Sequence, residues 1–128
     1  MEGRRAARER ALELLYEAEA KDIAAGDVID GLPVAPHPYA RLLATGVDEH
    51  RDEIDGLVSK YAKGWALDRM PAVDRALLRL ATYELVHHPN VPIAVVISEA
   101  VELASQFSTD DSSRFVNGVL SAIASRDG

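Results

Sequence analysis

Apolar residues recur at intervals of three and four along this chain, and prolines and glycines separate the segments in which they do so. Between Arg4 and Lys21 the apolar positions are Ala7, Ala11, Leu14, Leu15 and Ala18, with Leu12 and Tyr16 widening the stripe. This spacing places the residues on one face of an α-helix, whereas a half-buried strand needs strict alternation. The sequence therefore predicts a domain built from packed amphipathic helices.

Four further helices are expected, over residues 39–61, 71–86, 92–107 and from Ser108 onward. Val91 to Val101 holds six β-branched residues, which alone would favour a strand, but the length and the apolar spacing favour a helix. In the helix that begins at Pro92, the expected apolar positions run from Ile93 to Phe107. In the last helix, the residues expected to face inward are Phe115, Val116, Val119, Leu120 and Ile123.

Turn-forming and capping residues predict where these helices begin and end. Gly26 to Pro38 contains two glycines and three prolines and is expected to be a connecting loop. Gly46 is expected to kink or divide the helix over 39–61, and Asp68 is a candidate cap before Pro71. Ser108 and Asp111 have the spacing of a capping box.

The composition is that of one helical domain spanning residues 1–128. The chain has 128 residues, 48% of them hydrophobic and only 5% aromatic, which favours helices that pack through aliphatic side chains. No apolar run approaches the roughly 20 residues that a membrane span needs, and no hydrophobic signal core follows the start. We therefore expect an all-α cytoplasmic protein of about six to seven helices.

No pattern typical of a catalytic or cofactor site is present in the sequence. The chain lacks cysteine, and its four histidines, His37, His50, His87 and His88, belong to no recognisable triad. No two of them have the i, i+4 spacing that aims two imidazoles at one metal ion, and no glycine-rich phosphate loop occurs. We expect neither enzymatic activity nor a cofactor or metal.

The first ten residues form a basic segment in an acidic chain. The segment contains two glutamates and four arginines, Arg4, Arg5, Arg8 and Arg10. Its net charge is therefore +2, whereas the net charge of the whole chain is −7. Cations oppose the positive end of the helix dipole, so their presence at a helix start favours a functional role. Guanidinium groups bind phosphates through several donors and stack on bases. The segment indicates a local anionic partner rather than general adhesion.

A second unusual feature is Asn117-Gly118, which lies inside a helical pattern. Glycine inside a helix lowers the stability of the helix by about 1 kcal/mol relative to alanine, so a glycine at this position indicates a packing or functional role. One interpretation is close packing of another helix at Gly118. The other is that Arg114, Phe115 or Asn117 contacts nucleic-acid bases at this position.

Several ordered segments of the chain resemble the NusB family. They are RRAARE (4–9) with ALELLY (11–16), VDRALLRLATYEL (73–85), VP (91–92) through ISEAVELA (97–104), and DSSRFVNGVL (111–120). Together they cover nearly the whole chain in the family's order, and residues 23–38 match least.

The resemblance implies an all-α fold of two packed helical subbundles. It implies a transcription antitermination factor that binds the boxA element of ribosomal RNA leader transcripts. In the family, this occurs together with NusE, a protein of the small ribosomal subunit, in a complex on RNA polymerase. Some family members self-associate, and a homodimer that hides part of the RNA surface is therefore a second possibility.

The resemblance also assigns roles to individual residues. The positions implied to bind RNA are Arg4, Arg5, Arg8, Tyr16, Tyr61, Asp111, Arg114, Phe115 and Asn117. Asp111 is acidic and would tune affinity by repulsion, and Asp74 matches a position on the NusE-binding face. Ala6 interrupts the arginine run that is common in the family, and the acidic total is high.

We expect replacement of Arg4, Arg5 and Arg8 by alanine to abolish boxA affinity without changing the melting temperature. If about four phosphates are neutralised, the slope of log affinity against log salt concentration should be near −3. Two alternatives stay open. One is a protein-interaction or homodimeric scaffold whose arginines bind an acidic protein face. The other is a stand-alone relative of the NusB-like domain found in RNA cytosine methyltransferases. We expect no methyl transfer, because no cofactor-binding domain follows the helices.

Overall fold

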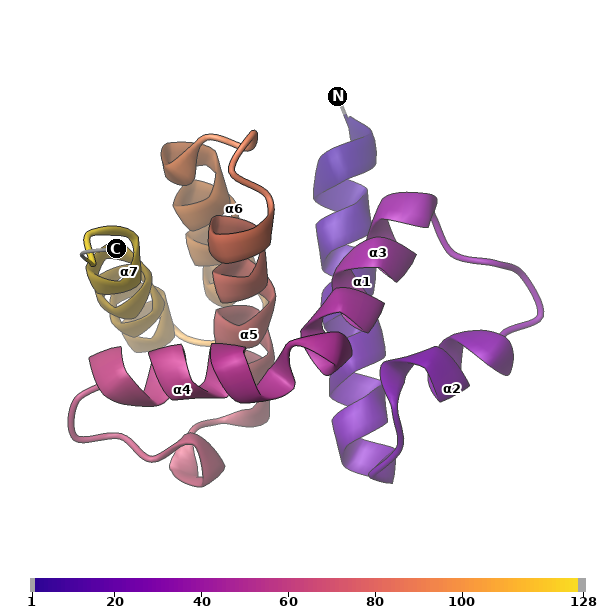
Figure 1. Ribbon diagram of the computed structural model, residues 1–128, viewed down its shortest axis with the longest axis horizontal. Helices are drawn as coiled ribbons and strands as arrows, with labels where there is room; N and C mark the ends of the chain where they lie inside the picture. Colours follow the sequence, from indigo (N-terminus) through magenta and orange to yellow (C-terminus); the bar gives the residue numbers. More distant parts are fainter. Residues whose placement is uncertain (1, 127–128) are drawn as a thin grey trace.

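The computed structural model describes residues 2–126 of the chain (Figure 1). This range forms seven α-helices and one short 3-10 helix: α1 (Glu2–Lys21), α2 (Ala25–Asp30), α3 (Pro38–Glu49), α4 (Arg51–Tyr61), η1 (Leu67–Arg69), α5 (Ala72–His87), α6 (Ile93–Phe107) and α7 (Asp110–Ala124). The predicted all-α fold class is confirmed for the described residues.

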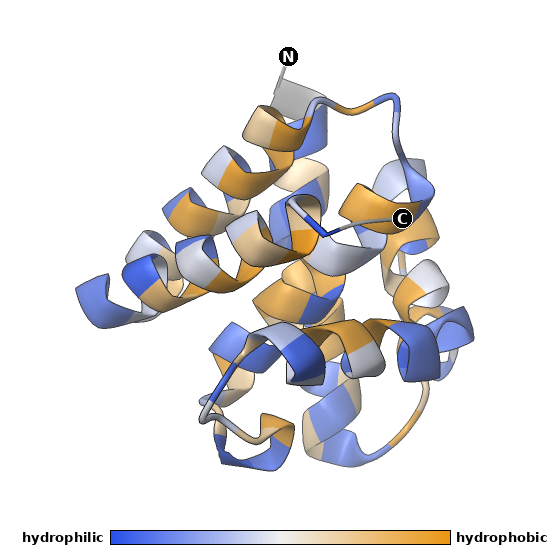
Figure 2. Ribbon diagram, turned by 60° about the vertical axis from the view of Figure 1, so that its left-hand side comes forward, coloured by the Kyte–Doolittle hydropathy of each residue, from blue (hydrophilic) through white to orange (hydrophobic). Residues whose placement is uncertain are grey.

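The helices form two groups that meet at α5. Helices α1, α2 and α3 pack on one another, and α4, α6 and α7 pack around α5, which also contacts α1 and α3. Figure 1 shows the first group on the right and the second on the left. Hydrophobic positions lie largely on the faces that helices turn toward one another (Figure 2). The two packed subbundles implied by the resemblance are confirmed.

The apolar stripe predicted for α1 is buried, and its members Ala7, Ala11 and Leu14 are almost fully inaccessible. Tyr16, at the edge of that stripe, is 48% exposed. In α6, Ile93 and Phe107 at the two ends are exposed, and the buried residues are Val96, Ala100, Leu103 and Ala104. Thus some apolar side chains of α6 lie on the surface and not in the core.

Two predictions about helix boundaries were wrong in the first group. Residues 25–30 form α2 rather than loop, because Ala25, Val28 and Ile29 are buried and the Ala25 N–H donates to Asp48 Oδ2 at 2.6 Å. The predicted helix over 39–61 does divide, but at His50, between α3 and α4, and not at Gly46.

Two predicted caps were also wrong in the second group. Asp68 lies in η1, and Pro71 occupies the N-cap position of α5. The cap of α7 is Thr109 rather than Ser108, since its side chain accepts a hydrogen bond from the Ser112 N–H at 3.0 Å. Both differences shift a boundary by a few residues and leave the helix order unchanged.

Gly46 stays helical because α3 passes very close to α5 there. A β-carbon at Gly46 would lie 2.2 Å from Cζ of Tyr83, a ring that is itself buried. We expect Gly46→Ala to destabilise the protein by about 1–3 kcal/mol through overpacking, despite the better helix propensity of alanine. Gly56→Ala is the matched control, since no atom lies within 4 Å there, and it should stabilise slightly. Urea denaturation measures both, and equal effects would contradict the packing argument.

The segment between α4 and α5 is held in place by Arg75. Its Nη1 donates to the carbonyl oxygens of Leu67 at 2.7 Å and Met70 at 2.8 Å, and its Nη2 is paired with Glu19 of α1. These bonds fix the connection that carries Trp65 against the body of the protein. None of the helices in residues 2–126 is long and apolar enough to cross a lipid bilayer.

Candidate nucleic-acid interface

The arginines of α1 differ sharply in what they contact. Arg4 is exposed, and its guanidinium carbon lies 4.0 Å from the ring centroid of Tyr39, a cation–π distance. Arg5 donates to both carboxylate oxygens of Glu99 in α6, at 3.1 and 2.7 Å. The hydrogen bond from Arg5 is the largest cause of the lowered pKa of Glu99. Both side chains are on the surface, but the charge of Arg5 already has a partner.

Arg8 is part of the protein interior. It is 5% exposed and donates to both oxygens of Glu84, which is 1% exposed, at 2.8 and 2.9 Å. The hydroxyl of Tyr39 donates to the same carboxylate at 2.7 Å. Burial, followed by this hydrogen bond, raises the pKa of Tyr39 to about 12. Arg8 therefore joins α1 to α5. The sequence predicts a surface position for its guanidinium, whereas in the structure this group is buried.

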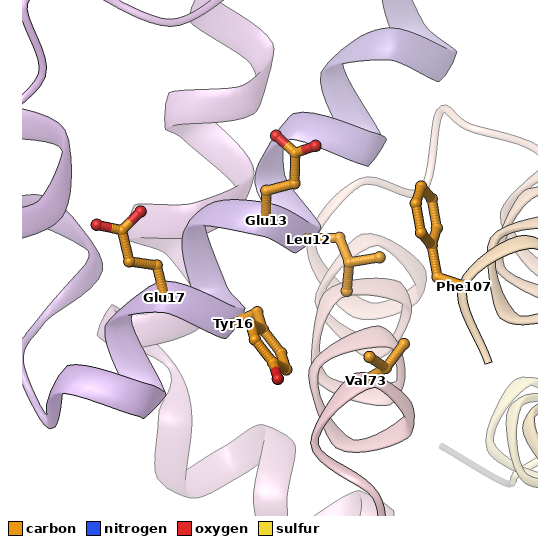
Figure 3. A pocket seen from close by; sticks show the side chains of 6 residues that line it. All are labelled: Leu12, Glu13, Tyr16, Glu17, Val73 and Phe107. Carbon is orange, nitrogen blue, oxygen red and sulfur yellow. The ribbon is translucent and has the colours of Figure 1, made fainter.

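Tyr16 lies on a different part of α1, in an apolar groove of about 380 Å³ (Figure 3). Leu12 and Tyr16 from α1 face Val73 of α5 and Phe107 of α6 across this groove. Glu13 and Glu17 line its rim. The groove combines an exposed aromatic ring with acidic side chains, which is unfavourable for a phosphate backbone in the immediate vicinity.

The structure brings three of the predicted RNA-binding residues together at a hollow of about 310 Å³ between α4 and α7. Tyr61, Arg114 and Phe115 line it together with Lys63 and Trp65, two residues that the sequence did not indicate as part of the site. Trp65 is 51% exposed, and its ring centroid lies 5.8 Å from that of Phe115. We call these five residues the aromatic–basic surface. It offers stacking faces and cations within one short stretch.

The remaining predicted residues of α7 lie beside this surface. Asp111 and Asn117 are exposed, and Asp111 is paired with Arg114. Gly118 lines the hollow, and no atom lies within 4 Å of where its β-carbon would be. The interpretation of Gly118 as a site of close helix packing was therefore wrong. The glycine leaves room at the surface, next to the rings.

Asp74, the residue assigned to partner binding, lies at a second hollow of about 340 Å³. It is 3% exposed, and its Oδ2 accepts a hydrogen bond from the Ser112 hydroxyl at 2.8 Å. Its Oδ1 is buried and has no hydrogen-bond partner among the described residues. Trp65 and Phe115 line this hollow as well, so it adjoins the aromatic–basic surface.

The predicted site residues thus fall into separate places. Figure 1 shows the start of α1 and helix α7 on opposite sides of α5 and α6. Trp65 could have been noticed from the sequence as the chain's one tryptophan, next to Lys63 and Gly64 in a connection between helices. No signal in the sequence pointed to Glu84 or Glu99 as partners of the arginines.

The fold and the surface together define a helical binding protein of two subbundles. A model of the NusB family matches residues 5–125. T. maritima NusB is 36% identical with a TM-score of 0.86, over 94% of this chain and 89% of that one. A chain in the crystal structure of a plectonemic RNA supercoil is 32% identical with a TM-score of 0.84, over 96% of this chain and 94% of that one.

A third solved structure is that of antitermination factors NusB and NusE in complex with double-stranded RNA. Its matching chain is 29% identical with a TM-score of 0.84, over 97% of both chains. The match of the family model to nearly the whole chain shows the family, and the chain belongs to the NusB family.

Proposed function

We propose that this protein is an antitermination factor that binds single-stranded boxA RNA of ribosomal RNA leader transcripts, together with NusE, in an RNA polymerase complex. The observation that carries the proposal is the aromatic–basic surface, found in a chain of the NusB family. Aromatic rings bind unpaired bases by stacking, and nearby cations bind the backbone. A protein of the same family is solved in complex with NusE and RNA.

The RNA in that solved complex is double-stranded, whereas we propose a single strand. The reason is physical, because the rings of Trp65 and Phe115 can stack only on bases that lie outside a duplex. Within this proposal, Tyr61, Phe115 and Trp65 offer faces to bases, and Arg114, Lys63 and Arg4 bind phosphates. Asn117 adds hydrogen bonds, and Asp111 limits affinity by competing for Arg114.

The other assigned residues take less direct roles in the proposal. Arg5 contacts RNA only by exchanging Glu99 for a phosphate, and Arg8 acts by holding α1 on α5. Tyr16 lies in the apolar groove, where Glu13 and Glu17 repel phosphates, so it contributes only at the edge of the RNA path. For NusE, we propose contact at the hollow that Asp74, Trp65 and Phe115 line.

A titration of labelled RNA followed by fluorescence anisotropy tests this function. BoxA RNA, a scrambled strand and the boxA duplex are compared, each with and without NusE. We expect boxA single strand to bind most tightly, and NusE to tighten it further. Equal affinity for all three RNAs would contradict the proposal. Binding of NusE without any RNA binding would favour the protein-interaction module, and sedimentation of the free protein reports whether a homodimer hides the surface.

The salt dependence of binding follows from the ion pairs. Arg8 is buried and Arg5 makes two hydrogen bonds to Glu99, so neither is counted. Arg4 and Lys63 are exposed, and Arg114 is paired only with the exposed Asp111, a weak surface pair that a phosphate can displace, which gives about three phosphates. The expected slope of log affinity against log salt is then about −2, and a fourfold rise in salt should weaken boxA binding roughly 20-fold. Anisotropy at several salt concentrations measures it. A slope of −3 or steeper would mean that Arg5 or Arg8 also releases its carboxylate to bind RNA.

A further inference from the structure

Two histidines and a glutamate meet where the two helix groups join, and none of them belongs to the aromatic–basic surface. His50 lies at the break between α3 and α4, Glu53 is in the first turn of α4, and His87 is the last residue of α5. One ligand atom from each lies within 4.8 Å of the other two. His87 Nε2 is 2.8 Å from Glu53 Oε1, and His50 Nδ1 is 3.6 Å from the same oxygen.

The surroundings hold these side chains in place. The rings of His50 and His87 have centroids 4.0 Å apart, and the ring of Tyr83 stacks on His87 at 5.2 Å. Tyr83 is buried and packs against Gly46, so it forms a fixed wall behind the imidazoles. Glu53 faces solvent, which leaves the cluster accessible from outside. The cluster is therefore arranged by packing on one side and open on the other.

We propose that His50, Glu53 and His87 bind one divalent transition-metal ion, with zinc as the expected metal. Two imidazole nitrogens and one carboxylate oxygen are a ligand set typical of zinc sites that keep a water molecule in the fourth position. Ligand bonds of about 2.0–2.2 Å place tetrahedral ligand atoms roughly 3.3 Å apart. The separations of the two imidazole nitrogens from Glu53 Oε1, 2.8 and 3.6 Å, lie on either side of that value, and the ligand atoms all lie within 4.8 Å of one another. Rotation of the two imidazoles out of their stacked arrangement would bring both nitrogens toward one ion.

A metal ion here would connect the junction of α3 and α4 to the end of α5, and so fasten one helix group to the other. No sequence spacing revealed this, because His50 lies between α3 and α4 while His87 ends α5, 37 positions further along the chain. A ligand that binds only the native state stabilises it by mass action. At a zinc concentration one hundred times the Kd, the melting temperature should rise by about 10 °C. This inference is independent of RNA binding.

The test uses metal-free protein without a histidine tag, titrated with zinc chloride in a calorimeter. We expect one ion per chain with a Kd in the micromolar range or tighter, and visible absorption bands of tetrahedral Co²⁺ when cobalt replaces zinc. Glu53→Gln and His87→Gln should each weaken zinc binding at least tenfold and abolish the rise in melting temperature. Glu53 is exposed, so its variant should keep the helical circular dichroism spectrum even if His87→Gln does not.

His37→Asn is the matched control. His37 is exposed and caps α3 by accepting a hydrogen bond from the Tyr39 N–H, a role that asparagine can take. This variant removes one imidazole and should bind zinc like the unmodified protein. Absence of saturable zinc binding, or unchanged affinity in Glu53→Gln, would overturn the proposal and leave the cluster as a hydrogen bond between His87 and Glu53.

Discussion

Replacing Arg8 with alanine should lower the free energy of unfolding by about 3–5 kcal/mol, because it leaves the buried carboxylate of Glu84 without its cation. Glu84 would keep only the hydrogen bond from Tyr39. Small domains are stable by about 5–15 kcal/mol, so the loss is a large part of the total. Urea denaturation followed by circular dichroism measures the change. We expect Arg8→Ala to melt far below the unmodified protein.

Two controls separate this effect from a general effect of removing positive charge. Arg5→Ala removes an exposed cation that is also bonded to a glutamate, and it should change stability little. The triple variant Arg8→Leu, Glu84→Leu, Tyr39→Phe replaces the polar network with apolar groups and should recover much of the loss. If Arg8→Ala unfolds at the same urea concentration as the unmodified protein, the network does not hold α1 on α5.

This outcome reverses one expectation drawn from the sequence. The sequence predicts that Arg4, Arg5 and Arg8 form one surface patch whose removal leaves melting unchanged. A basic segment can be recognised from the sequence, but the acidic residues that pair with it cannot. Glu84 is 76 positions and Glu99 is 94 positions away from the arginines they bind. Such distances along the chain are bridged only by the packing of α1 against α5 and α6.

The fold could be predicted more fully than the site. Helical spacing is a local property, so α1 with its inner face, α5, α6 and α7 were predicted, while α3 and α4 were predicted as one helix whose break was placed at Gly46 instead of His50. Helix α2 was missed because glycines and prolines dominate residues 26–38, while the acceptor at its start, Asp48, comes from α3. Local turn signals are overridden when a distant side chain satisfies the backbone.

The candidate site was predicted in part for the same reason. Arg114 and Phe115 lie four and three positions before Gly118, so helix geometry places each of them on the same side of α7 as Gly118. Trp65 comes from the connection between α4 and α5, and its place beside Phe115 depends on how Arg75 holds that connection. No periodic pattern indicates where a loop residue lies.

Trp65→Ala should weaken binding of single-stranded boxA RNA by about 5- to 150-fold, the range expected when one stacked base loses its aromatic partner. Trp65 is half exposed, so the melting temperature should change little. It is also the only tryptophan in the chain, so its fluorescence reports on one position. Titrating the unmodified protein with unlabelled RNA should quench that fluorescence if a base stacks on the ring. Anisotropy with labelled RNA measures the affinity of the variant.

Two further variants make this result specific to stacking. Trp65→Phe keeps an aromatic face and should retain most of the affinity, while Val34→Ala removes an exposed apolar side chain elsewhere and should retain all of it. Unchanged RNA affinity in Trp65→Ala, together with weaker binding of NusE, would make the aromatic–basic surface a protein interface. The adjoining hollow of Asp74 would then extend the same interface, and the RNA would have to bind along α1, where Arg4 is exposed. Helices α5 and α6 lie between α7 and the start of α1 (Figure 1). Loss of RNA affinity in both Trp65→Ala and Arg4→Ala would therefore show that the RNA spans the aromatic–basic surface and the start of α1.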